Sequence, residues 1–334
     1  MEASEAAKNA LENVLEAVAG ERIVIVCDDE KSEIGKAFAD GALTLGLWTR
    51  WMVLKTGKEA RTEVPPHLLE VLTQQKPDIY VNLMRGGREE TPFRIRIINI
   101  ETRYKRSRLG HCPGVTLDML TDGALALTPE EHRSMQSFAD KLIQTLDRTA
   151  EVEIHNPAGT HLSLSVKERS FFTDTKMDWR EMKWMNLPTG EVIVAPVENS
   201  MEGRLVCDMA IGGIGPIKTP LTVDVKKGRA EKVTSKNKDV LRRVKDTFDT
   251  DDWSDIVGEF AFGINPKARF VEEFLEAEKM LETVHIAFGH NTDFPAGKNT
   301  SKNHMDLLMS KPTVKVTKED GAKVTVMEKG RFKI

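Results

Sequence analysis

The chain is poor in cysteine, in aromatic side chains and in long apolar runs. Its three cysteines, Cys27, Cys112 and Cys207, include no CxxC pair, so the sequence predicts neither a disulfide framework nor a cysteine zinc site. Aromatic residues make up 6% of the chain and charged residues 30%, which predicts a heavily charged surface. No apolar run reaches the ~18 residues of a membrane span, and no basic segment leads into an apolar one near Met1. We therefore expect a cytoplasmic protein with no membrane partner.

Net charge and length limit the expected partners and the number of domains. The formal net charge of -4 provides no basic field that would attract nucleic acid or an anionic membrane, so neither is an expected partner. The 334 residues exceed one ordinary hydrophobic core and predict two domains.

Residues 1–149 alternate helical and extended patterns, which is typical of an α/β domain with a mostly parallel, Rossmann-like sheet. Thr128-Pro129-Glu130-Glu131 predicts a capping box at the start of the last helix. The predicted helices cover residues 4–18, 33–45, 66–74, 91–104 and 129–146, and the predicted strands cover 22–27, 47–54 and 78–83.

Residues 150–334 are dominated by short strand patterns separated by Gly, Pro, Asn and Asp, which predicts an α+β domain with an antiparallel sheet. The main helices of this half are predicted at 236–248 and 268–281. Asp320-Gly321 supplies the turn of a predicted hairpin over 313–327. The overall expectation is an α/β protein in which this second domain carries the functional residues.

Five potential metal ligands lie in short strand-like runs of the second domain. His304 and Asp306 are two residues apart, so in extended chain their side chains point to the same face. Carboxylates and imidazoles in runs that otherwise favour burial would be costly without a compensating cation. The predicted metal ligands are Glu191, Glu259, His285, His304 and Asp306.

This donor set defines the expected chemistry. Two imidazoles and three carboxylates without thiolates suit Zn, Co or Mn, and a bridging carboxylate could hold two such ions about 3.5–4 Å apart. Such a centre activates a water for hydrolysis, and one of the two glutamates, Glu259 in preference to Glu191, would transfer protons. Which residue bridges the ions stays open at this point.

Four segments carry a resemblance to a known family. They resemble, in the family's order, the signatures of the thermophilic metalloaminopeptidases typified by aminopeptidases T and S, with this chain on a shorter branch. The resemblance implies that the five ligands bind two divalent ions, that the α/β domain caps the metal-bearing domain, and that the protein is a homodimer. The segments are Asn186-Leu187-Pro188-Thr189-Gly190-Glu191-Val192, Gly258-Glu259-Phe260-Ala261-Phe262-Gly263-Ile264-Asn265-Pro266, Thr283-Val284-His285-Ile286-Ala287-Phe288-Gly289 and Ser301-Lys302-Asn303-His304-Met305-Asp306.

Two positions depart from the family pattern. The Tyr that follows the first ligand His by seven residues, and that completes the peptidase site, is Thr292 here. The Gly that usually precedes that His by three residues is Glu282. The chain therefore lacks a phenol that could bind metal or stabilise an oxyanion, which leaves Thr292 as a candidate substrate contact.

The leading hypothesis is a two-metal aminopeptidase that attacks the first peptide bond of short peptides. A rival is a ring-cleaving dioxygenase of the dihydroxypyridine type, in which one Fe(II) is held by His285, His304 and Asp306 and His111 acts as a substrate base. Against this rival, Glu191 and Glu259 would be left as uncompensated charges. A third possibility is a non-catalytic relative that keeps the fold and the metal.

Overall fold

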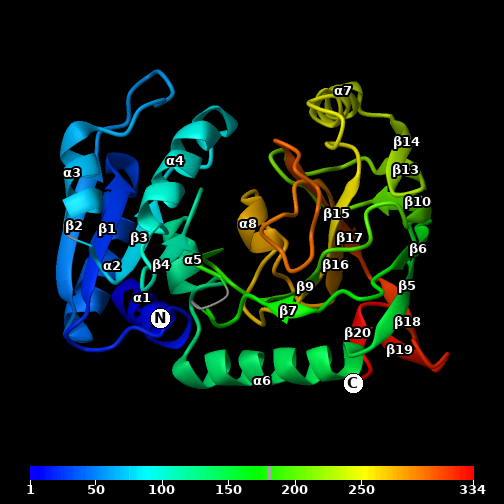
Figure 1. The fold of residues 1–334 in the computed structure, drawn as a ribbon, viewed down its shortest axis with the longest axis horizontal. Coiled ribbons are helices and arrows are strands. Elements are labelled where there is room, and N and C mark those ends of the chain that lie inside the picture. Colours follow the sequence, from blue (N-terminus) through cyan, green and yellow to red (C-terminus); the bar gives the residue numbers. More distant parts are fainter. Residues whose placement is uncertain (75, 179–181) are drawn as a thin grey trace. The chain divides into compact units, whose positions relative to one another are not determined.

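The computed structural model describes residues 1–74, 76–178 and 182–334 (Figure 1). The chain forms two compact units, and the division falls inside helix α6 (Pro129–Leu146). Unit 1 comprises Met1–Gln136, Asp174–Thr189 and Pro266–Arg269, and unit 2 comprises Ser137–Thr173, Gly190–Asn265 and Phe270–Ile334. Within the described residues, no helix is both long and apolar enough to cross a membrane.

Unit 1 is built on a five-stranded parallel sheet in the order β2-β1-β3-β4-β8. This confirms the predicted Rossmann-like α/β arrangement. Its strands are β1 (Arg22–Asp28), β2 (Trp48–Leu54), β3 (Ile79–Leu83), β4 (Arg108–His111) and β8 (Trp184–Asn186). Its helices are α1 (Ala3–Asn13), α2 (Ser32–Thr44), α3 (Pro66–Gln74), α4 (Thr91–Glu101) and α5 (Leu117–Thr121).

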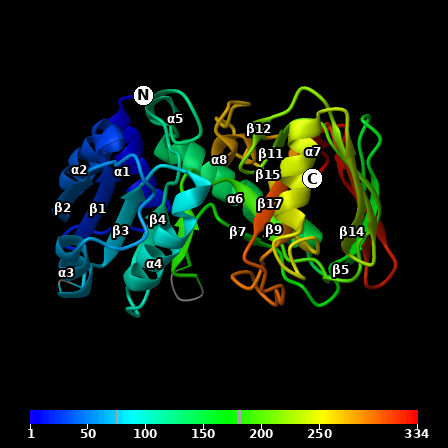
Figure 2. The same ribbon diagram turned by 90° about the horizontal axis from the view of Figure 1, so that it is seen from above.

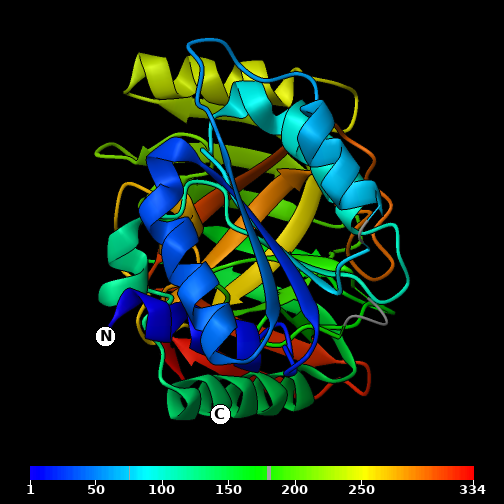
Figure 3. The same cartoon turned by 90° about the vertical axis from the view of Figure 1, so that its left-hand side faces the viewer.

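The alternation of side chains along β1 gives unit 1 two cores. Ile23, Ile25 and Cys27 pack with α1, α2 and α5 on one face of the sheet. Val24 and Val26 pack with α3 and α4 on the other face. The result is a sheet covered by helices on both sides, seen in Figure 3 with α2 toward the reader.

Two predicted helices of unit 1 end earlier than the sequence predicts. The helix predicted for 4–18 ends at Asn13, because the chain turns through Glu16 at φ 51° before it enters β1. The helix predicted for 91–104 ends at Glu101. The predicted capping box is confirmed, since the Glu131 backbone N–H donates to Thr128 Oγ1 and the Thr128 N–H donates to Glu131 Oε2.

Unit 2 contains two antiparallel sheets that lie face to face, with α7 (Lys238–Phe248) beside β14 (Figure 2). The eight-stranded sheet has the order β14-β13-β10-β6-β5-β18-β19-β20, and the seven-stranded sheet has the order β12-β11-β17-β16-β15-β9-β7. The first consists of β5 (Thr149–His155), β6 (His161–Ser165), β10 (Glu202–Cys207), β13 (Leu221–Lys226), β14 (Arg229–Ser235), β18 (Thr313–Lys318), β19 (Lys323–Glu328) and β20 (Arg331–Phe332). The second consists of β7 (Phe172–Thr173), β9 (Glu191–Val194), β11 (Ala210–Ile211), β12 (Gly215–Pro216), β15 (Val257–Gly263), β16 (Thr283–Gly289) and β17 (His304–Ser310).

The seven-stranded sheet separates apolar from polar residues by face. Phe260 and Phe262 of β15 lie on one face, where the Phe262 ring lies 6.0 Å from the ring of Phe332 in the other sheet. Glu259 has the opposite orientation, because side chains alternate along a strand. The apolar face thus forms the core between the sheets and leaves the opposite face for polar groups.

The helix predicted for 268–281 is wrong. Only Phe274–Ala277 is helical (α8), and the backbone N–H of Asn265 donates to the Lys279 carbonyl at 2.9 Å. Glu278 and Lys279 form a turn after α8, and this contact and a β-bridge between Asn265 and Met280 hold the turn beside the end of β15. Tertiary contacts therefore override the helical pattern.

A β-bulge fixes the position of Glu259. Val257 pairs with Phe288 and Glu259 with Ala287, so Gly258 is the extra residue of β15. A Cβ atom at Gly258 would lie 2.3 Å from the Gly289 carbonyl oxygen. Only glycine permits this close approach of two backbones.

We expect Gly258→Ala to lower the free energy of unfolding by roughly 1–3 kcal/mol, because the two strands must separate to admit the methyl group. Denaturant titration measures the change. Gly57→Ala is the matched control, since its added Cβ would meet no atom closer than 3.7 Å. Equal stability of the two variants would contradict the structural role of this bulge.

Candidate metal centre

Four neighbouring strands of the seven-stranded sheet bring the five predicted ligands together. Glu191 is the first residue of β9, Glu259 lies in β15, His285 in β16, and His304 and Asp306 in β17. In the register of these strands Ala287 pairs with both Glu259 and Asp306. A small residue between the two carboxylates leaves space for a ligand above the sheet.

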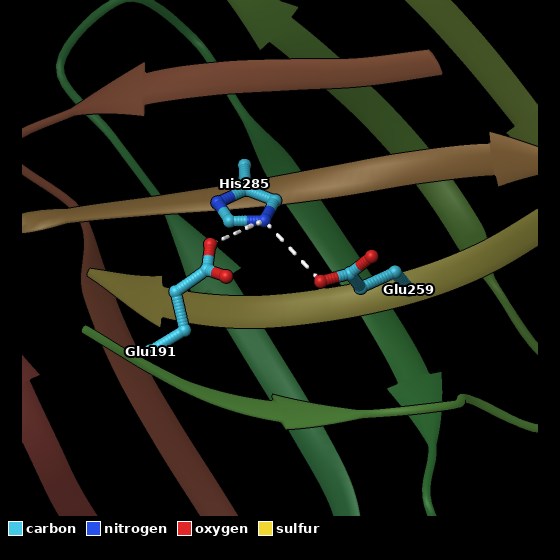
Figure 4. A group of neighbouring side chains, drawn as sticks. All are labelled: Glu191, Glu259 and His285. Atoms are coloured by element: carbon cyan, nitrogen blue, oxygen red, sulfur yellow. Dashed lines mark ion pairs between the residues drawn. The ribbon is translucent and has the colours of Figure 1, made fainter. Parts of the chain in front are cut away.

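Glu259 lies between the two imidazoles. Its Oε1 is 3.4 Å from His285 Nε2, and its Oε2 is 3.0 Å from His304 Nε2. Figure 4 shows His285 between Glu259 and Glu191. The distance from Glu191 Oε1 to His285 Nε2 is 3.3 Å. Each oxygen of Glu259 therefore faces a different histidine.

The remaining ligands complete two overlapping groups. Asp306 Oδ1 is 3.3 Å from His304 Nε2 and 3.9 Å from His285 Nε2. Ligand atoms of Glu191, Glu259 and His285 lie within 4.8 Å of one another, and so do those of Glu259, His304 and Asp306. Both groups contain Glu259, which is therefore the residue that they share.

The orientation of His304 is set from outside the centre. Its Nδ1 lies 2.8 Å from the His290 carbonyl oxygen, so this nitrogen carries the proton and donates it to the backbone. The other ring nitrogen, Nε2, then faces the carboxylates, to which it donates when protonated and beside which its lone pair can bind a metal ion. Such a backbone contact fixes both the tautomer and the ring plane of a metal-binding histidine.

The carboxylates and imidazoles perturb one another strongly. Burial alone would raise the pKa of Glu259, but hydrogen bonds from His285 and His304 hold its pKa well below its usual range. Burial would lower the pKa of His304, yet Asp306 and Glu259 raise it well above its usual value. The pKa of His285 is likewise raised, because Glu259 outweighs burial. In the absence of metal, protons on the histidines partly balance the carboxylates.

The donor set fits divalent metal ions. Glu191 and Glu259 are each 4% exposed, and His285 is 1% exposed. Buried carboxylates at such short separations repel one another unless cations lie between them. Oxygen and imidazole donors without sulfur are those of Zn, Co, Mn or Fe sites.

Sequence reasoning missed two charged residues of this centre. Glu278 groups with His285 and Asp306, and burial raises its pKa to about 8. Lys279 forms salt bridges with Glu191 and with Glu278 Oε1, the latter at 3.0 Å. Both fall in the segment 268–281, for which the sequence predicts a helix. The only sequence signal is that this segment directly precedes the strand of His285.

The two departures from the family pattern have different structural settings. Thr292 is exposed, and its Oγ1 lies 3.1 Å from His290 Nε2. The contact places it in the loop whose His290 carbonyl orients His304. Glu282 has φ 67°, in the left-handed region that favours glycine, so the backbone at the entry to this strand suits the Gly of the family pattern.

His111, the predicted substrate base, belongs to unit 1. It is the last residue of β4, and it is 5% exposed. Its Nδ1 contacts Asn82 Oδ1, and burial lowers its pKa to about 3, so the ring is neutral at physiological pH. Asn82 in turn donates to Glu101 Oε2 at 2.9 Å. These contacts form a buried polar chain within unit 1, which accounts for the histidine without a substrate.

The fold and the ligand set together define a metal-dependent enzyme with a carboxylate-rich centre on an antiparallel sheet. The model of the thermophilic metalloprotease (M29) family matches residues 129–332. The chain belongs to this family, and the expected metallopeptidase class is confirmed.

Two solved structures show the same fold over nearly the whole chain. One is 2,5-dihydroxypyridine dioxygenase from Pseudomonas putida KT2440, with 15% identity, a TM-score of 0.72, and coverage of 99% of this chain and 96% of that one. The other is AmpT from Thermus thermophilus, with 18% identity, a TM-score of 0.71, and coverage of 99% of both chains. A comparison with curated proteins found no match.

We expect His304→Ala to lose at least one metal ion per chain, because the variant removes one of the three donors in the group of Glu259, His304 and Asp306. Elemental mass spectrometry after dialysis measures the metal content. His67→Ala, at an exposed position of α3 in unit 1, is the control for loss of a histidine. Retention of the full metal content by the His304 variant would remove this site from consideration.

The buried carboxyl of Glu101 predicts a pH dependence of stability. Burial raises its pKa to about 8, whereas an unfolded glutamate titrates near about 4.3. Between these values the folded state holds a proton that the unfolded state has lost, so the free energy of unfolding falls as pH rises from about 4.3 to 8. We expect Glu101→Gln to remove up to about 1.4 kcal/mol per pH unit of this dependence, measured by denaturant titration. Parallel profiles of both proteins would contradict the raised pKa.

Proposed function

We propose that the protein is a metal-dependent aminopeptidase that removes the N-terminal residue of short peptides with a water activated between two divalent ions. The observation that supports this most directly is the position of Glu259, with one oxygen toward each imidazole. A mononuclear centre has no need for a bridging carboxylate. Membership of the metalloprotease family supports the same reaction class.

Each ion position has its own ligands in this proposal. Glu191 and His285 hold one ion, His304 and Asp306 hold the other, and Glu259 bridges them. When bound, the ions polarise the scissile carbonyl and lower the pKa of the attacking water. Zn, Co and Mn suit these donors.

Proton transfer is assigned to one of the two glutamates. Glu259 has both oxygens directed at imidazoles, which favours bridging over proton exchange. Glu191 has Oε2 on the Lys279 ammonium and Oε1 toward His285. A neighbouring ammonium makes a carboxylate a weaker proton acceptor, so neither glutamate is favoured over the other, and the proton of the water passes to the leaving amine through Glu259 or Glu191.

The substrate is a peptide with a free amine, and no nucleic acid or membrane takes part. A carboxylate close to the ions would recognise the ammonium group of such a peptide. Thr292 lies in the loop that orients His304 and is a candidate substrate contact in place of the family Tyr. A homodimer in the cytoplasm is part of the same proposal.

The second candidate is a mononuclear Fe(II) dioxygenase. His285, His304 and Asp306 supply two imidazoles and one carboxylate, the ligand set of many non-haem iron oxygenases. The salt bridge between Lys279 and Glu191 favours this candidate, because it compensates a carboxylate that would otherwise be left unpaired in a one-metal site.

The deciding experiment combines metal content with two assays. Protein purified without an affinity chelate is analysed by elemental mass spectrometry, then tested with a short peptide and its N-acetylated twin. We expect two Zn, Co or Mn ions per chain and release of the first residue from the free peptide only. The metal-free protein should release no residue from either peptide.

One iron per chain, with oxygen uptake in the presence of a dihydroxypyridine, would move the assignment to the dioxygenase. Metal binding without turnover in either assay would point to a non-catalytic relative. Cleavage of both peptides at an internal bond would retain the hydrolase and reject the aminopeptidase.

A further inference from the structure

Lys279 provides a buried positive charge on one side of the metal centre only. Its side chain is 3% exposed, and its ammonium contacts Glu191 Oε2 and Glu278 Oε1. The backbone hydrogen bond from Asn265 to its carbonyl fixes the segment beside β15. The position of the ammonium is therefore built into the fold of unit 2.

The two ion positions differ in their contact with this charge. Glu191, a ligand of the first position, divides its oxygens between the Lys279 ammonium and His285. The carboxylates of the second position, Glu259 and Asp306, form salt bridges with histidines only, and no Lys or Arg among the described residues pairs with them. An ion at the first position meets a carboxylate that is already partly neutralised.

We propose that Lys279 makes the two ion positions unequal, so that the position of His304 and Asp306 binds a divalent ion more tightly than the position of Glu191 and His285. This inference rests on the proposed two-ion centre. Two effects act in the same direction: the ammonium competes for Glu191, and it repels a dication nearby. Lys279 is a positioning residue, because it acts on the metal through Glu191.

The same salt bridge stabilises the protein before metal binds. Without Lys279, Glu191 and Glu278 would be buried carboxylates with one cation fewer between them. A metal ion at the first position would take over that compensation. Removal of the lysine should therefore destabilise the metal-free protein and strengthen metal binding at the weak position.

The test is a titration of the metal-free protein with Co²⁺. Calorimetry and visible absorption measure the binding at each addition. All proteins carry His161→Gln, because His155 and His161 face each other with their Nδ1 atoms 3.0 Å apart on the other sheet and could hold an additional ion. The variants are Lys279→Met, which removes the charge, and Lys279→Gln, which keeps a hydrogen-bond donor for Glu191. Lys318→Met in β18 is the control for loss of a partly buried lysine.

With Lys279 present we expect two binding steps whose affinities differ by about tenfold or more. Both Lys279 variants should strengthen the weaker step by about tenfold or more, leave the tighter step within about threefold, and show a larger rise in Tm on metal saturation. Lys318→Met should leave both steps unchanged. A protein that binds one ion with Lys279 present and two after its removal is the limiting case of the same effect.

Two equal steps with Lys279 present would overturn the proposal, and this outcome does not depend on the folding of any variant. A weaker step that stays the same or becomes weaker in both variants would overturn it too. If Lys279→Met loses both binding steps and Lys279→Gln keeps them, Lys279 acts as a hydrogen-bond donor for Glu191 and not through its charge, which would also overturn the proposal. Unequal binding steps without peptidase activity would reject the proposed function and leave this inference standing. Equal binding steps with peptidase activity would reject this inference and leave the proposed function standing.

Discussion

The structure of this centre depends on the repulsion among carboxylates held close together away from water. Glu191, Glu259, Glu278 and Asp306 converge on one face of a sheet. Each would be costly to bury alone, and together they repel one another. The protein meets this with two imidazoles, one lysine and the capacity to bind divalent ions. Metal binding and the stability of unit 2 are therefore linked, because the ions compensate the same charges that destabilise the metal-free state.

The sheet can hold these charged groups because one of its faces is apolar and packs in the core, while the other face carries the polar side chains. Phe260 and Phe262 anchor β15 in the core between the sheets, so the strand keeps its place when charged residues occupy the opposite face. The glycine bulge at Gly258 then sets the register of Glu259 against β16. Ligands on neighbouring strands are more rigid than ligands on loops, and a rigid set suits ions that must be held a fixed distance apart.

The ligands could be predicted from sequence because a strand imposes a short, simple period. The pair of His304 and Asp306, and single acidic or imidazole residues in otherwise apolar runs, indicate one buried polar face. Lys279 and Glu278 could not be found this way, since the sequence predicts a long helix over their segment, whereas the structure places both in a turn after α8 that a bridge between Asn265 and Met280 holds beside β15. The early end of the first helix at Asn13 has a similar origin, because a left-handed turn at Glu16, which sequence patterns seldom indicate, redirects the chain.

The balance between one metal and two depends on how the fold distributes its own cations. The sequence alone favours two ions, because it indicates no positively charged partner for Glu191 or Glu259. Lys279 supplies one for Glu191, so the argument for a second ion now rests on Glu259, whose two oxygens contact two different imidazoles. A single buried lysine can thus change the metal requirement of a site without altering any of its ligands. Two proteins of this fold with the same five ligands can differ in metal number if only one of them places an ammonium beside the first glutamate.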